Sequence, residues 1–201
     1  MGKYKSLDLY IMQTAVVTPY CQEGIEILRR CHESVLTQTL EITHFMVADG
    51  YAHKEIDGWH CRHIILPTCH KDNGNTPRGI GALCAMNEGF QSILFLDADN
   101  WYDPRHAEVV DNTHSQENCD VVFARRHIVF PDGDILLEED WEDRDLSHVD
   151  TSCFAIYSNA FSGSSANGVV FLARGGGLDV LRDERQGVFL SGAGAFGALA
   201  G

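Results

Sequence analysis

Two aspartates one residue apart, Asp97 and Asp99, are the side chains of this sequence best suited to chemistry. They follow residues 93–96, whose four consecutive apolar side chains predict a buried strand. Acids at the carboxyl end of a strand lie where open α/β sheets bind ligands. Ionised carboxylates are hard ligands that suit Mg²⁺ or Mn²⁺, together with water and substrate phosphates. The pair therefore indicates a Mn²⁺ or Mg²⁺ site that meets a diphosphate; the alternative is that both acids only form a turn or cap a helix.

Strands and helices alternate along the first 160 residues. Apolar runs, several of them rich in β-branched residues, predict strands at residues 10–18, 43–48, 63–66, 93–96, 121–124, 128–130 and 153–157. Apolar side chains at helical spacing predict helices at residues 23–37, 77–89 and 104–115. The alternation indicates an α/β protein with a Rossmann-like, mostly parallel sheet flanked by helices. We expect the first strand to stop at Pro19, because proline has no N–H for the ladder.

Polar residues follow each of the first four predicted strands. Because the carboxyl ends of parallel strands share one edge, we expect residues 18–21, 49–50, 67–78 and 97–101 to gather there. Arg78 falls in the first turn of a predicted helix, where the helix dipole disfavours a cation. That placement favours an anionic partner for Arg78, with a surface salt bridge as the alternative.

Four short motifs, in this order, resemble those of the family 2 nucleotide-sugar glycosyltransferases, which have the GT-A fold. The resemblance covers about residues 10–160 and rests on residues 15–20 (AVVTPY), 47–50 (VADG), 73–78 (NGNTPR) and 95–99 (FLDAD). Four motifs in order are more specific than any one of them. The resemblance implies transfer of a sugar from a nucleoside-diphosphate sugar, expected to be UDP-linked, to an acceptor hydroxyl, with Mn²⁺ or Mg²⁺ as cofactor.

The same resemblance implies roles for individual side chains. It places a nucleotide against a set drawn from all four motifs, namely Thr18, Pro19, Tyr20, Asp49, Arg78 and Asp97. Within that set, Asp49 would accept a hydrogen bond from a pyrimidine ring N–H, and Arg78 would meet the nucleotide or its phosphates through two donors. Asp97 would reach the ribose or a metal-bound water, and Asp97 and Asp99 are the expected metal ligands.

The catalytic base is where the chain departs from that family. An inverting transferase needs a carboxylate to take the proton of the attacking hydroxyl. In the family this base usually follows the strand that corresponds to residues 153–157, but here only Gly- and Ala-rich sequence follows. Residues 148–151 (HVDT) resemble the acceptor-side segment, so Asp150 is the candidate base, with a cap or turn as its alternative role.

Composition limits the classes of partner and the number of domains. The chain has 201 residues, 44% of them hydrophobic, and a formal net charge of −14, which disfavours nucleic acid and anionic membranes as partners. The acid-rich residues 132–150 are expected to form a solvated loop; the alternative is an acceptor-side or metal-rich loop. We predict one GT-A domain over residues 1–158 and a weakly structured Gly/Ala-rich tail over residues 159–201.

Seven cysteines and no secretory signal favour reduced thiols in a cytoplasmic protein. Cys61, His63, Cys69 and His70 are all possible zinc ligands, but their spacing fits no common zinc finger, so we do not predict a zinc site from them. The first six residues match the loose myristoylation pattern, which is a weak signal. The sequence contains no run of 18 or more apolar residues, so it predicts no transmembrane segment.

Two other functions stay open at this point. A phosphatase of the haloacid-dehalogenase type also uses D-x-D after an apolar strand, but its strand lies near the N-terminus, and Asn100 and Trp101 do not fit its motif. A domain that binds a nucleotide sugar or a divalent cation without turnover fits the unusual C-terminal composition. Product release with UDP-sugar, Mn²⁺ and an acceptor would separate the enzyme from this binding domain.

Overall fold

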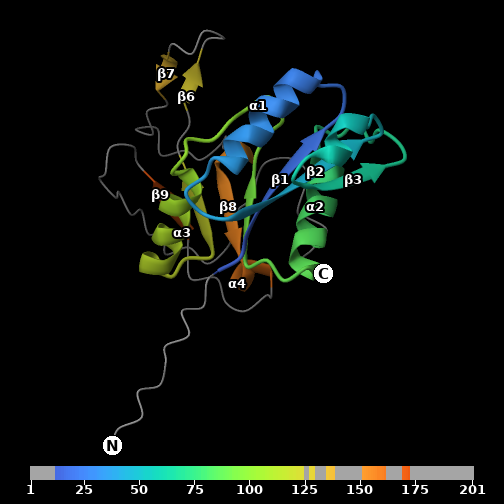
Figure 1. Cartoon of the computed structure of the whole chain (residues 1–201). Helices are drawn as coiled ribbons and strands as arrows, with labels where there is room; N and C mark the ends of the chain where they lie inside the picture. The colour runs from blue at the N-terminus through green and yellow to red at the C-terminus, as the bar shows by residue number, and fades with distance from the viewer. Residues whose placement is uncertain (1–11, 125–126, 130–134, 139–150, 162–168, 173–201) are drawn as a thin grey trace, which may run out of the picture.

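The computed structural model describes residues 12–124, 127–129, 135–138, 151–161 and 169–172. Its centre is a seven-stranded sheet with the order β3-β2-β1-β4-β8-β5-β9 (Figure 1). The strands are β1 (Thr14–Tyr20), β2 (Ile42–Asp49), β3 (Arg62–Leu66), β4 (Ser92–Phe95), β5 (Val121–Ala124), β8 (Phe154–Tyr157) and β9 (Val169–Leu172). Only β8 runs antiparallel to its neighbours, β4 and β5. The expected mostly parallel sheet is confirmed.

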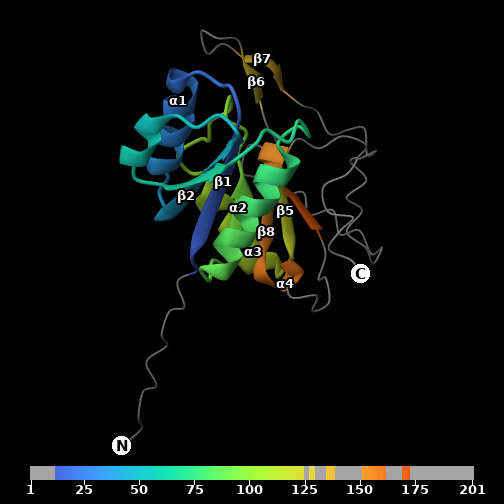
Figure 2. The same cartoon turned by 90° about the vertical axis from the view of Figure 1, so that its right-hand side faces the viewer.

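Helices cover both faces of the sheet. They are α1 (Ile25–Leu36), α2 (Asn75–Asn87), α3 (His106–Glu117) and the short α4 (Ser158–Phe161), with the 3₁₀ turns η1 (Lys54–Gly58) and η2 (Thr151–Cys153). Figure 2 shows α2 on the near face and α3 behind the sheet. Because side chains alternate along a strand, Val16 of β1 packs into the core with α1 and α3, whereas Ala15 and Val17 pack into the core with α2. The two helical layers thus bury both faces of the central strands.

Three sequence predictions need correction or comment. β1 continues through Pro19 to Tyr20, because β4 pairs with β1 only as far as Val17, so the missing N–H costs no bond on that side. Residues 135–138, inside the predicted acidic loop, form β7 (Ile135–Glu138), which pairs with β6 (His127–Val129) because this short segment is apolar. β9 falls within the predicted tail and pairs with β5, while most of that tail lies outside the described residues.

Gly81 sets the distance between α2 and the sheet. A Cβ added there would lie 2.5 Å from a methyl carbon of Val17 and 2.9 Å from one of Val47, whereas a Cβ at Gly79 would meet nothing within 4 Å. We therefore expect Gly81→Ala to lower the free energy of unfolding by about 1–3 kcal/mol through overpacking.

Gly79→Ala is the matched control, because it changes the same helix at a position with open space. It should leave stability unchanged or raise it by about 1 kcal/mol, since alanine favours the helix over glycine. Urea denaturation of both variants measures the difference. Equal stabilities for the two variants would show that α2 does not approach the sheet at Gly81.

Candidate functional site

The carboxyl ends of β1, β2, β3 and β4 lie at one edge of the sheet, because these four strands are parallel. We call this edge, with the turns that follow the strands, the rim. It carries Tyr20 at the end of β1, Cys21 directly after it, Asp49 at the end of β2, and Asp97 two residues after β4. The expected gathering of the polar segments at one edge is thus what the sheet topology produces.

Arg78 and Asp97 form an ion pair at the rim. The Nη2 of Arg78 lies 2.6 Å from Oδ1 of Asp97, and the Arg78 side chain is 7% exposed against 31% for Asp97. Arg78 lies in the first turn of α2, as predicted, with its N–H bonded to the carbonyl of Gly74. Its Nε is buried and has no hydrogen-bond partner among the described residues. A cation in this disfavoured position is therefore held by an acid, with one donor still unsatisfied.

The turn that contains Asp97 is fixed from the antiparallel side of the sheet. Thr151 donates its hydroxyl to Asp97 Oδ2 at 3.1 Å, and Ser152 accepts from the Asp97 N–H at 3.0 Å. Ser152 also accepts from the side-chain amide of Asn100 at 3.0 Å. Sequence reasoning missed both hydroxyls, because they lie more than 50 residues from the motif that they support.

Asp99 has an exposed side chain beyond this ion pair. Its backbone carbonyl accepts from Arg30 of α1 at 2.8 Å, and Arg30 also lies over the Trp101 ring, 4.2 Å from its centroid. The backbone is therefore anchored while the carboxylate faces solvent. Of the two acids, Asp99 is the one available to a soluble ligand without breaking an ion pair.

Gly74 joins the Arg78–Asp97 pair to the end of β1. It has a left-handed φ of +77°, and an added Cβ would lie 3.2 Å from Cγ of Pro19 and 3.5 Å from Nη2 of Arg78. Asp72 takes over the capping of α2 by accepting from the N–H of Thr76 at 2.9 Å. Pro19, Gly74, Arg78 and Asp97 are thus contiguous, which brings together the first, third and fourth sequence motifs.

Asp49 lies at the neighbouring strand end and bonds to His70. One carboxylate oxygen lies 2.5 Å from the ring Nδ1 of His70, and the other accepts the His70 backbone N–H at 2.9 Å. Burial acts to raise the pKa of Asp49, but the hydrogen bonds from His70 outweigh it, so the pKa lies below its ordinary value. Asp49 is therefore an ionised acceptor at neutral pH.

Tyr20 and Thr18 point into the interior rather than out of the rim. The Tyr20 hydroxyl lies 2.6 Å from Nε2 of His63, whose Nδ1 lies 2.7 Å from Asp57, and burial raises the pKa of Tyr20 to about 12. Thr18 is fully buried, and its hydroxyl lies 2.8 Å from Nε2 of His44. Their backbones lie at the end of β1, but these two side chains support the strand end from beneath.

The buried pair His32 and His44 makes stability depend on pH. Their Nδ1 atoms lie 2.8 Å apart, and burial lowers the pKa of His32 to about 4 and that of His44 well below its ordinary value. In the unfolded chain both imidazoles bind a proton below about pH 6.5, whereas in the folded chain His32 binds one only near pH 4 and His44 only well below its ordinary pKa. The free energy of unfolding therefore falls as pH decreases from about 6.5 to 4. We expect His32 alone to account for about 3 kcal/mol of the loss between pH 7 and 4.

Urea denaturation of His32→Gln at both pH values tests this. The variant should lose about 3 kcal/mol less than the wild type over the same interval. His53→Gln is the control, because His53 lies 3.0 Å from the carbonyl of Glu23 and glutamine retains a donor for it. An unchanged pH response in His32→Gln would contradict the assignment.

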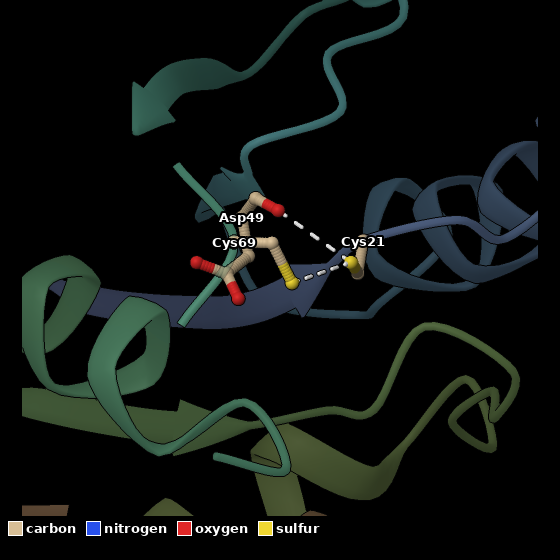
Figure 3. Close-up of side chains that lie close together, drawn as sticks. All are labelled: Cys21, Asp49 and Cys69. Atoms are coloured by element: carbon tan, nitrogen blue, oxygen red, sulfur yellow. Dashed lines mark hydrogen bonds between the residues drawn. The ribbon is translucent and has the colours of Figure 1, made fainter. Parts of the chain in front are cut away.

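A cluster of two thiols and a carboxylate lies at the same rim. The sulfurs of Cys21 and Cys69 are 3.3 Å apart, and the Cys21 thiol also lies 3.5 Å from the Asp49 carbonyl (Figure 3). Cys69 thus meets Cys21 and not Cys61, with which the sequence analysis considered it. The signal that could have found this pair is that Cys21 directly follows β1 and Cys69 lies three residues after the end of β3, the two strands being parallel members of one sheet. Asp150, the candidate base, lies outside the described residues.

The sheet order, the helical layers and the rim define the GT-A fold that the sequence motifs implied. S. aureus TarS, a GT-A glycosyltransferase, has this fold, and its 1–349 structure matches 76% of this chain with a TM-score of 0.59 and 12% sequence identity. The same protein in complex with UDP and in complex with UDP-GlcNAc matches with TM-scores of 0.58 at the same identity. The expected fold is therefore confirmed.

This likeness concerns part of those proteins. The match spans 49% of the TarS 1–349 chain, and 29% of the longer TarS structure. No family model matches the sequence, and no curated protein matches it. Among the described residues, no helix is long and apolar enough to cross a membrane.

Proposed function

We propose that this chain is a glycosyltransferase that moves a sugar from a nucleoside-diphosphate sugar, with UDP as the expected nucleotide, to an acceptor hydroxyl. The observation that carries the proposal is the Arg78–Asp97 ion pair beside Pro19 and Gly74, on the rim of a GT-A fold. The likeness to a protein solved with UDP and UDP-GlcNAc supports the choice of donor, as do the four sequence motifs.

A divalent cation of the Mn²⁺ or Mg²⁺ class fits the donor set of the rim. Asp99 offers an exposed carboxylate, and Asp97 keeps 31% of its side chain exposed although it pairs with Arg78. Such cations prefer hard oxygens and take one or two carboxylates together with substrate phosphates. Asp99 would therefore hold the cation, with Asp97 at its side. When bound, the cation supplies positive charge where the leaving diphosphate develops negative charge.

Individual side chains of the chain have separate roles in this reaction. Arg78 stabilises the departing diphosphate, and Asp97 with Thr151 fixes the orientation of the guanidinium. The Asp49 carboxylate accepts the ring N–H of the base, because its pKa is low enough to keep it ionised. Asp150 takes the proton of the attacking hydroxyl, in an inverting displacement. Thr151, which follows Asp150 in the chain, donates its hydroxyl to Asp97.

The decisive experiment is a calorimetric panel of nucleoside diphosphates with and without Mn²⁺, followed by a turnover assay. We expect UDP to bind more tightly than ADP or GDP, and Mn²⁺ to strengthen that binding. Release of UDP from a UDP-sugar on addition of acceptor hydroxyls would establish transfer. Tight UDP binding with no turnover on any acceptor would identify a binding domain instead. Failure of every nucleotide to bind would overturn the proposal.

A further inference from the structure

Cys21, Asp49 and Cys69 form what we call the thiol cluster. One ligand atom from each residue, either a sulfur or a carboxylate oxygen, lies within 4.8 Å of the other two. Figure 3 shows both sulfurs directed toward each other, with the Asp49 carboxylate beside Cys69. Asp49 is buried and both cysteines are half-buried, so the cluster lies just beneath the surface of the rim. Three ligand atoms therefore converge on one small volume.

The fold brings these three residues together from separate elements. Cys21 follows β1, Asp49 ends β2, and Cys69 lies in the loop between β3 and α2. Gly50 makes this approach possible, because it has a φ of +84° and an added Cβ would lie 2.4 Å from the backbone nitrogen of Cys69. The site is thus built on two strand ends and on one loop that packs tightly against them, which is a more rigid support than loops alone.

The ligand set is softer than that of Asp97 and Asp99. Two thiols and one carboxylate, with an imidazole next to them, are the ligands that zinc takes, whereas Mg²⁺ and Mn²⁺ prefer oxygen alone. A tetrahedral zinc ion with Zn–S bonds of about 2.3 Å separates its sulfur ligands by about 3.8 Å. The observed separation of 3.3 Å needs only a small expansion to reach that geometry.

His70 supplies the outer support that such a site needs. Its ring and its backbone N–H each contact one of the two oxygens of Asp49, which fixes the orientation of the carboxylate. Zinc ligands usually have a partner of this kind. The backbone N–H of Cys21 is likewise held, by Glu23 at 2.6 Å. The Asp49 carboxylate and the Cys21 backbone are therefore already held in place without a bound ion.

We propose that the thiol cluster binds a soft divalent cation of the zinc class, with both sulfurs as thiolates, one oxygen of Asp49 as the third ligand and a fourth position open to water. Each thiol releases its proton to solvent when the metal–sulfur bond forms. The site is separate from the Mn²⁺ or Mg²⁺ proposed at Asp99. It shares Asp49 with the proposed nucleotide site, but its test uses no nucleotide and therefore does not depend on sugar transfer.

The test is titration of the full chain, reduced with a phosphine, with Zn²⁺ in competition with a chromogenic chelator, and with Co²⁺ followed by absorption. We expect one Zn²⁺ per chain and, for Co²⁺, a near-ultraviolet band from thiolate-to-cobalt charge transfer. Cys21→Ser and Cys69→Ser should each weaken Zn²⁺ binding by about 100-fold or more and reduce that band.

Cys61→Ser is the matched control, because Cys61 is also half-buried but its thiol contacts the carbonyl of Ile56, 3.8 Å away. It should bind Zn²⁺ like the wild type. Zinc affinity that is the same in the wild type and in both cluster variants overturns the proposal, as does a cobalt complex of the wild type with no thiolate band. The cobalt spectrum needs no variant, so it decides the matter even if a substitution prevents folding.

Discussion

Asp99→Asn is expected to abolish the part of UDP binding that depends on Mn²⁺. The side chain is exposed, and its backbone is held independently by Arg30, so the substitution removes a hard ligand without disturbing the turn. Because a bound Mn²⁺ supplies positive charge beside the negative diphosphate, we expect UDP affinity in the presence of Mn²⁺ to fall about 100-fold. Calorimetry with and without Mn²⁺ measures both affinities for the variant and the wild type.

Glu41→Gln is the control for this measurement. Glu41 is an exposed acid just before β2, at the end of the sheet opposite to the rim, and its substitution changes the net charge by the same amount. It should leave the Mn²⁺ effect intact. If Asp99→Asn keeps the full Mn²⁺ effect while both variants fold, Asp99 does not hold the cation and the metal part of the proposed function is wrong.

Arg78→Met is expected to have the second large effect, on both binding and stability. It removes the cation that pairs with Asp97 and that we assign to the diphosphate, so UDP affinity should fall about 100-fold. Stability should fall by only about 1–3 kcal/mol, because Asp97 stays partly exposed and keeps its hydrogen bond from Thr151. Calorimetry gives the first quantity and urea denaturation the second.

Arg62→Met tests whether any lost arginine would do the same. Arg62 pairs with Glu88 at 3.2 Å at the surface, with side chains 60% and 39% exposed, and such surface pairs are worth about 1 kcal/mol or less. UDP affinity should be unchanged in this variant. A loss of stability in Arg78→Met with normal UDP affinity would show that Arg78 is a structural ion pair and nothing more, which is the alternative that the sequence left open.

The sequence predicted those parts of the fold that depend on local apolar patterns. The runs at residues 93–96 and 121–124 correspond to β4 (Ser92–Phe95) and β5 (Val121–Ala124), because their side chains are buried on both faces of the sheet. Pro19 misled the prediction of a strand end, because the cost of proline depends on whether a neighbouring strand needs its N–H. That information is not local, and it comes only from the strand order.

In the candidate site, too, local motifs were predicted and contacts between distant segments were not. Arg78 and Asp97 were recognised from motifs and do form a pair. Thr151 and the pairing of Cys21 with Cys69 were not foreseen, since they join segments 54 and 48 residues apart with no characteristic spacing. The rule that parallel strand ends meet at one edge did place residues 18–21 near residues 67–78, but it cannot select one side chain from the loop. Asp150 and the domain boundary at residue 158 stay predictions.

The tight contact at Gly50 has a mechanical consequence. With its Cα seated against the backbone of Thr68 and Cys69, the turn after β2 leaves no free volume between itself and the next loop. We therefore expect the turn after β2 and the loop at Thr68 and Cys69 to move together. A ligand that displaces Asp49 would therefore also displace the loop that leads to the start of α2, where Arg78 lies.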